Sequence, residues 1–87
     1  MVHYEAVYEV RDGKRGIEGV LLYRGKVVAK VPVKKRTSLG YEVRRAFELA
    51  ELLGYYLVLF RVSAELLLDV EGSDFLSSFG VDVAFLR

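Results

Sequence analysis

Two acidic side chains occupy positions where carboxylates are suited to chemistry. Asp12 closes an alternating segment at residues 4–11, and Glu42 lies in the first turn of an expected helix. Carboxylates brought together from separate elements can hold Mg²⁺, and such ions activate water. Each placement also has a structural explanation, because Asp favours turns and an acid favours the first turn of a helix. The pair is a candidate metal site with a purely structural alternative.

A row of basic residues forms a second candidate site. Lys26, Lys30 and Lys34 recur every four residues along an expected strand, which predicts one face with spacings of about 13 Å. The full set is Arg24, Lys26, Lys30, Lys34, Lys35 and Arg36. Such a row favours phosphate contacts with DNA or RNA without base reading. The alternative is that lysines on an edge strand oppose aggregation.

Other kinds of site find little support in the composition. His3 is the only histidine, and without cysteine the chain has no disulfide and no thiolate metal ligand. The glycines near residues 13–19 do not precede a helix, so they lack the context of a phosphate-binding loop. The start lacks the features of a signal peptide, and no apolar run approaches the ~20 residues of a membrane span. We expect a cytoplasmic protein without a resident cofactor, apart from Mg²⁺ if nuclease activity remains.

The first third of the chain predicts three antiparallel strands that would position Asp12 and the lysines. Residues 4–11 alternate with a period of two, and residues 17–23 and 27–33 form two further strand segments. Gly-containing turns join them. Pro32 cannot donate a ladder hydrogen bond, so the third strand is expected at an edge or at a bulge.

A helix over about residues 39–53 would carry Glu42. Its apolar face is predicted to hold Val43, Ala46, Phe47, Ala50 and Leu53. Ser38 or Thr37 can cap its start, and Gly54 stands where a C-terminal cap is expected.

The remaining segments predict the rest of a mixed sheet. Residues 36–40 interrupt the strand pattern, and apolar residues 55–62 predict a buried strand parallel to the first. A short helix is expected over 64–70, a helical turn over 75–79 and a last strand over 81–86. The fold class is therefore α/β (α+β) in one domain, residues 1–87.

The segment from Asp12 to Ser63 resembles the ribonuclease H family and its wider superfamily. The matching motifs are Asp12-Gly13 at the end of the first strand, the turn Tyr23-Arg24-Gly25, the loop Arg36-Thr37-Ser38, and Glu42 followed by Ala46. The resemblance implies a βββαβαβ order and a mixed five-stranded sheet in which the fourth strand lies beside the first.

The resemblance also implies what the chemistry would need. The family gathers acids from three elements on a pair of Mg²⁺ ions; Asp12 and Glu42 match two of them, whereas Val62-Ser63 stands where an Asp-Ser pair is expected. Glu65 follows two residues later. The resemblance therefore implies a minimal, catalytically deficient nucleic-acid-associated module. The alternatives are a weak metal-dependent nuclease using Asp12 and Glu42, and a homodimeric interaction domain that binds no nucleic acid.

Charge and composition bear on partners. Residues 1–45 hold 11 of the 13 Lys and Arg but 5 of the 12 acids, so the basic residues concentrate in the first half. This asymmetry favours an anionic partner or self-association, and the alternative is that the two halves interleave in space so that their charges cancel. One helix covers one sheet face, so we expect Val20, Leu22 or their alternates to be exposed on the other face and a homodimer to bury them. The alternative is a monomer whose second face is closed by residues 64–79. The absence of Asn, Gln, Cys and Trp beside 29% charged residues suggests a thermophile.

Overall fold

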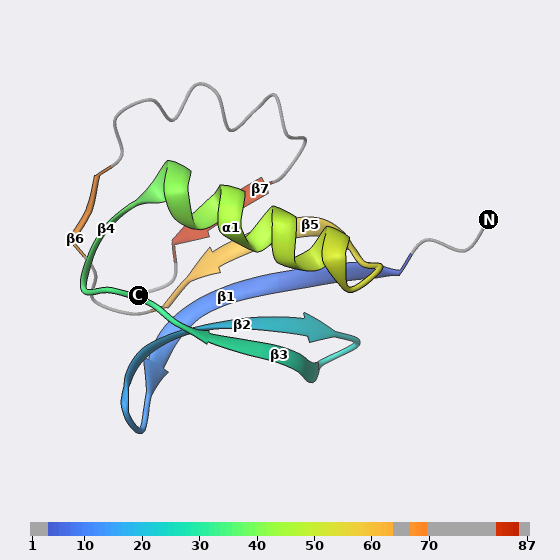
Figure 1. The fold of residues 1–87 in the computed structure, drawn as a ribbon, viewed down its shortest axis with the longest axis horizontal. Helices are drawn as coiled ribbons and strands as arrows, with labels where there is room; N and C mark the ends of the chain where they lie inside the picture. The colour runs from blue at the N-terminus through green and yellow to red at the C-terminus, as the bar shows by residue number, and fades with distance from the viewer. Residues whose placement is uncertain (1–3, 64–66, 70–81, 86–87) are drawn as a thin grey trace.

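A five-stranded mixed sheet with one helix across a face forms the body of the protein in a computed structural model (Figure 1). The structure describes residues 4–63, 67–69 and 82–85. In chain order the elements are β1 (Glu5–Gly13), β2 (Gly16–Tyr23), β3 (Lys26–Pro32), β4 (Arg36–Ser38), α1 (Leu39–Leu52), β5 (Tyr56–Val62), β6 (Leu67–Asp69) and β7 (Asp82–Phe85). Among these residues, no helix is long and apolar enough to cross a membrane.

The sheet has the strand order β3-β2-β1-β5-β7. Strands β1, β2 and β3 form an antiparallel meander, β5 runs parallel to β1, and β7 runs parallel to β5. The predicted meander, the parallel neighbour of the first strand and the last strand are therefore confirmed. Pro32 ends β3 at the edge of the sheet, as its missing N–H predicts.

Helix α1 begins and ends where the sequence predicts. The Ser38 hydroxyl accepts a hydrogen bond from the Tyr41 N–H at 3.1 Å, and Gly54 adopts a φ of 84° just beyond the end. The core side of the helix carries Leu39, Val43, Ala46 and Ala50, all buried against the sheet. The prediction for Leu53 was wrong. It is the C-terminal cap, outside helical geometry, and 44% of its surface is exposed.

Removing the helix cap should have a moderate effect on stability. We expect Ser38→Ala to lower the free energy of unfolding by about 1 kcal/mol, because the Tyr41 N–H loses its partner at the start of the helix. Urea denaturation measures the change. Ser63→Ala is the matched control, since Ser63 is exposed and its hydroxyl makes long hydrogen bonds of 3.3 and 3.4 Å to described residues. Equal losses in the two variants would contradict a specific capping role.

Two local predictions were wrong for the same reason. Residues 36–38, expected to be irregular, form β4, and residues 67–69, expected within a helix over 64–70, form β6. The two short strands pair in parallel as a separate ladder. Hydrogen bonding between distant segments therefore overrides the helix propensity of Leu67 and Leu68. The helical turn expected over 75–79 lies outside the described residues.

The sheet face opposite α1 is less exposed than expected. Val20 is completely buried, and Leu22 is partly buried. In the strand register Val20 stands between Glu9 and Lys30, and long charged side chains can cover apolar surface with their aliphatic stems. The expectation of an exposed Val20 was therefore wrong. Dimerisation itself stays a prediction.

Candidate functional site

Glu42 is buried at the start of α1, between the helix and the sheet. Only 1% of its surface is exposed. Its Oε2 accepts a hydrogen bond from the Thr37 hydroxyl at 3.3 Å, and its Oε1 lies 3.9 Å from the Arg45 guanidinium. Burial raises the pKa of Glu42, and the Arg45 charge and the Thr37 hydrogen bond oppose this only in part. The carboxyl group is therefore a packed interior group that favours its neutral form.

The Tyr8 hydroxyl shares this interior. It is buried and has no hydrogen-bond partner among the described residues, and the same holds for Glu42 Oε1. Burial, followed by the charge of Glu42, raises the pKa of Tyr8, while Arg45 acts in the opposite direction. The Tyr8 ring stacks on Phe60 with 5.5 Å between centroids. Both groups therefore belong to the packing of the helix on the sheet.

The burial of Glu42 makes stability depend on pH. The pKa of Glu42 in the folded state lies above the unfolded value near 4.5. The stabilising contribution of protonated Glu42 to the free energy of unfolding is therefore complete below about pH 4.5 and is lost as pH rises through the folded-state pKa. We expect Glu42→Gln to be about 1 kcal/mol more stable than wild type at pH 7, with a smaller difference at pH 4. Urea denaturation at both pH values measures this, with the exposed Glu51→Gln as control. A wild type more stable than Glu42→Gln at pH 7 would contradict it.

Asp12 lies in different surroundings. It is exposed near the end of β1, opposite Ile17 in the strand register, at the β1–β2 hairpin. The hollows that it lines also contain Arg15, and Glu42 lines neither of them. Neither of these two hollows, which described residues line, therefore brings Asp12 and Glu42 together.

Val62, at the position where the resemblance implies a third carboxylate, lies in the core. Val62 pairs with Val10 and is 4% exposed. The Ser63 hydroxyl donates to Glu9 Oε1 at 3.4 Å and to the Val10 carbonyl at 3.3 Å. Within residues 4–63, 67–69 and 82–85, no three His, Cys, Asp or Glu side chains gather in a way that could hold a metal ion. The described residues do not fit a Mg²⁺ pair, which needs several oxygen ligands.

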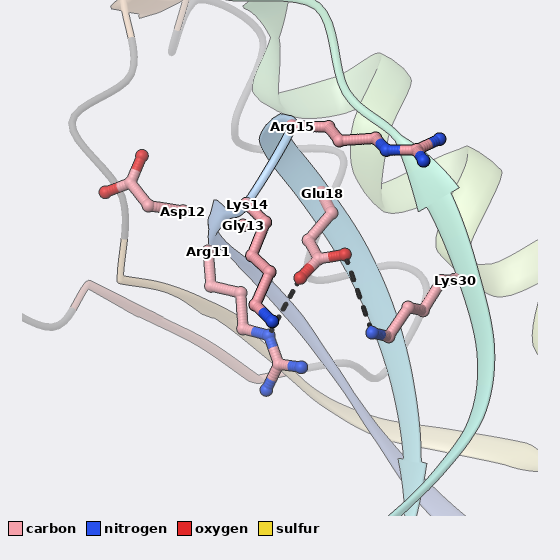
Figure 2. A pocket seen from close by; sticks show the side chains of 7 residues that line it. All are labelled: Arg11, Asp12, Gly13, Lys14, Arg15, Glu18 and Lys30. Carbon is pink, nitrogen blue, oxygen red and sulfur yellow. Dashed lines mark ion pairs between the residues drawn. The ribbon is translucent and has the colours of Figure 1, made fainter.

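A cationic hollow, here called the hairpin groove, lies beside the β1–β2 turn. Its volume is about 820 Å³. Figure 2 shows the residues that line it: Arg11, Asp12, Gly13, Lys14, Arg15, Glu18 and Lys30. Four of them are basic and two are acidic, and the Asp12 carboxylate extends away from the basic side chains in this view. The lining therefore has an excess of positive charge.

Two smaller hollows adjoin the hairpin groove through shared residues. Arg15 and Gly16 line both, with volumes of about 590 and 350 Å³, and Lys35 lines the larger. The Arg15 side chain points toward β3 in Figure 2. Cationic lining therefore continues from the β1–β2 turn toward the end of β3.

The predicted basic row is divided by the strand register. A bulge between β2 and β3 leaves Lys30 opposite Val20 but Lys26 opposite Tyr23, and these two partners point to opposite faces of β2. The prediction of one shared face was therefore wrong. Arg24 and Lys26 lie at the β2–β3 turn, at the other end of β3 from the hairpin groove. Lys30 and Lys35 line the cationic hollows, while Lys34 and Arg36 are exposed beyond the end of β3.

Sequence reasoning missed Arg11, Lys14 and Arg15. Their signal was present as three basic residues within five positions, interrupted by Asp12 and Gly13. The hairpin turn places Lys14 and Arg15 at its tip, with Gly13 paired to Gly16. Only the pairing of β1 with β2 shows that these basic residues line one hollow, so the sequence pattern by itself does not identify them.

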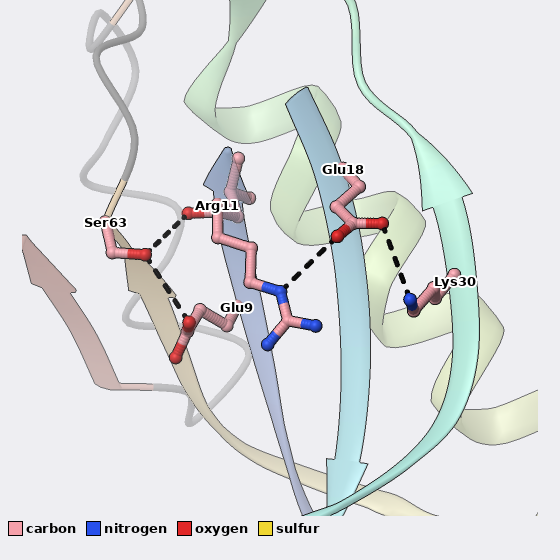
Figure 3. A network of polar contacts seen from close by, with 6 residues as sticks. Glu9, Arg11, Glu18, Lys30 and Ser63 are labelled. Carbon is pink, nitrogen blue, oxygen red and sulfur yellow. Dashed lines mark hydrogen bonds and ion pairs between the residues drawn. The ribbon is translucent and has the colours of Figure 1, made fainter. Parts of the chain in front are cut away.

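Charged pairs cross the open face of the sheet (Figure 3). Glu18 lies 3.5 Å from Arg11 Nε and 3.9 Å from Lys30 Nζ. On the neighbouring strand pair, Arg61 lies 2.9 Å from Glu9. Both distances at Glu18 exceed those of a short charge-assisted hydrogen bond, so Arg11 and Lys30 are held loosely.

Aromatic side chains gather at the far end of the sheet. Tyr4, Tyr23 and Tyr55 pack on one another with ring centroids 5.2 to 6.4 Å apart. These rings already use one another as packing surfaces, whereas Tyr41 is 60% exposed. Tyr4, Tyr23 and Tyr55 therefore form a packed cluster away from the hairpin groove.

Comparisons of the chain with protein-family models, with curated proteins and with solved structures found no match.

Proposed function

We propose that this chain is a catalytically deficient ribonuclease H-like module that binds DNA or RNA through phosphate groups at the hairpin groove. The observation that carries the proposal is that Arg11, Lys14, Arg15 and Lys30 line one hollow. Lys and Arg side chains that neutralise phosphates supply sequence-independent affinity and release counterions from the nucleic acid. The expected partner is therefore a phosphodiester backbone, with no base preference required.

The fold supports the ribonuclease H-like part of the proposal. The strand order β3-β2-β1-β5-β7 has an antiparallel meander first and a parallel strand beside β1, as the resemblance implies. Asp12 lies near the end of β1 and Glu42 lies in the first turn of α1, which are the positions that the resemblance implies. The burial of Glu42 and the core position of Val62 support a binding role without catalysis.

Salt dependence tests the binding proposal. A fluorescence anisotropy titration of duplex DNA, single-stranded RNA and an RNA–DNA hybrid would be made between 50 and 300 mM salt. We expect log affinity to fall linearly with log salt, with a slope of about −3 to −4 if four phosphates are contacted. No binding at 50 mM would sink the proposal and favour an interaction domain without nucleic-acid binding.

The nuclease alternative has its own test. Incubating the RNA–DNA hybrid with Mg²⁺ or Mn²⁺ should leave it intact, because buried Glu42 and exposed Asp12 lie in different surroundings. Cleavage by wild type that is lost in Asp12→Asn would establish the metal-dependent nuclease instead. Asp12→Asn should retain binding, because the substitution leaves all four groove cations in place.

A further inference from the structure

We infer that Glu18 is a built-in competitor for the phosphate site, so that nucleic acid binds by displacing its carboxylate from between Arg11 and Lys30. The inference rests on the proposed function and assigns the control of that same site. Glu18 lines the hairpin groove together with both cations. It is an acid placed where the proposed ligand would bring its own negative charge.

The geometry of Glu18 imitates that of a bound phosphate. One carboxylate oxygen faces Arg11 Nε at 3.5 Å and the other faces Lys30 Nζ at 3.9 Å, as Figure 3 shows. Two non-bridging oxygens of a phosphodiester can face two cations in the same way. A phosphate and the Glu18 carboxylate would therefore compete for one position.

The existing pairs are weak enough to exchange. The side chains of Arg11 and Lys30 are 33% and 55% exposed, and that of Glu18 is 24% exposed. Exposed pairs at such distances contribute little to stability and are screened by salt. A nucleic-acid backbone can contact Lys14 and Arg15 at the same time as Arg11 and Lys30. These are contacts that the single Glu18 carboxylate does not make. The arrangement therefore favours a polymer with several phosphates over a single phosphate ion.

Gly13 leaves the space that the competing carboxylate occupies. A Cβ atom on Gly13 would lie 2.7 Å from both Glu18 Cδ and Oε1, so the carboxyl group packs directly against this glycine. The backbone φ of Gly13 is not positive, so alanine is tolerated there. The Gly13→Ala variant would therefore keep the charge of Glu18 while moving its carboxylate out of place.

The decisive experiment compares Glu18→Gln, Gly13→Ala, Glu51→Gln and wild type. Anisotropy with the same duplex DNA would be followed from 50 to 300 mM salt, and thermal unfolding would confirm that each variant is folded. We expect Glu18→Gln to bind about fourfold more tightly, because a repulsive charge about 5 Å from the phosphate is removed. For this variant, the slope of log affinity against log salt should be steeper by the amount that about one further phosphate contact contributes. Gly13→Ala should also bind more tightly, by a smaller factor.

Glu51→Gln is the charge-matched control, because Glu51 is exposed near the end of α1 that leads to β5, away from the hairpin. It should leave affinity unchanged, since charges beyond about 10 Å are largely screened. If wild type binds DNA but Glu18→Gln binds it no more tightly, this inference is overturned and the proposed function stands. The same holds if Glu51→Gln gains as much affinity as Glu18→Gln. No binding by any of the four proteins overturns the proposed function and this inference with it.

Discussion

Gly19→Ala is expected to lower the free energy of unfolding by about 3 kcal/mol, a large part of the stability of so small a domain. An added Cβ atom would lie 1.7 Å from the Tyr8 hydroxyl oxygen and 2.4 Å from the ring carbon that bears it. Tyr8 cannot move aside, because it is completely buried and stacked on Phe60. The added methyl group therefore has to displace the ring or separate β1 from β2. Urea denaturation and thermal unfolding measure the loss.

Two variants separate this clash from a general effect of replacing glycine. Gly13→Ala meets only the end of the flexible Glu18 side chain, so it should cost less than 1 kcal/mol, as surface changes usually do. In a Tyr8→Leu background, Gly19→Ala should cost much less than it does in wild type, because leucine does not reach across to residue 19. Equal costs in both backgrounds would show that Tyr8 is not the reason for the glycine.

Removing two cations from the hairpin groove is expected to have the largest effect on binding. The double variant Arg15→Ala/Lys30→Ala should lose about 1.8 units of salt slope and bind on the order of 50-fold more weakly at 0.1 M salt. Both side chains line the groove, and Arg15 also lines the two adjoining hollows. Anisotropy titrations across the salt range measure both quantities.

Arg24→Ala/Lys26→Ala is the matched control, since it also removes one Arg and one Lys from the chain. These residues lie at the β2–β3 turn, about 10 Å or more along the sheet from Lys30, since the β2 partners of Lys26 and Lys30 are Tyr23 and Val20. The control should bind nearly as well as wild type. An equal loss of affinity in the two double variants would mean that the interface extends along the whole of β3, or that binding depends on net charge alone.

The sequence predicted the elements whose signals are local. The alternation of apolar and polar residues predicted the β1–β3 meander, and Pro32 predicted the edge position of β3. Ser38 and Gly54 predicted the two ends of α1. Strands β4 and β6 were missed because each is short and is defined by its pairing with the other, 31 positions apart in the register. Local propensity carries no information about such a pair.

The candidate site was only partly predictable for a related reason. Lys30 belongs to a row of lysines that recurs every four residues, and Lys35 follows the end of that row, but the bulge in β3 reverses the direction of the side chains and divides the row. Lys14 and Arg15 have no periodicity because they occupy a turn. The burial of Glu42 was also hidden in the sequence, because first-turn acids are commonly exposed and only the packing of α1 on the sheet places this one inside.

Mapping the contact surface by NMR tests whether nucleic acid binds at the hairpin groove. Amide chemical shifts of ¹⁵N-labelled protein would be followed by NMR during titration with a short DNA duplex at 50 mM salt. We expect the largest changes at residues 11–18 and 30–35, around the hairpin groove, and little change at Arg24 and Lys26. Changes confined to the β2–β3 turn, or none anywhere at saturating DNA, would contradict it.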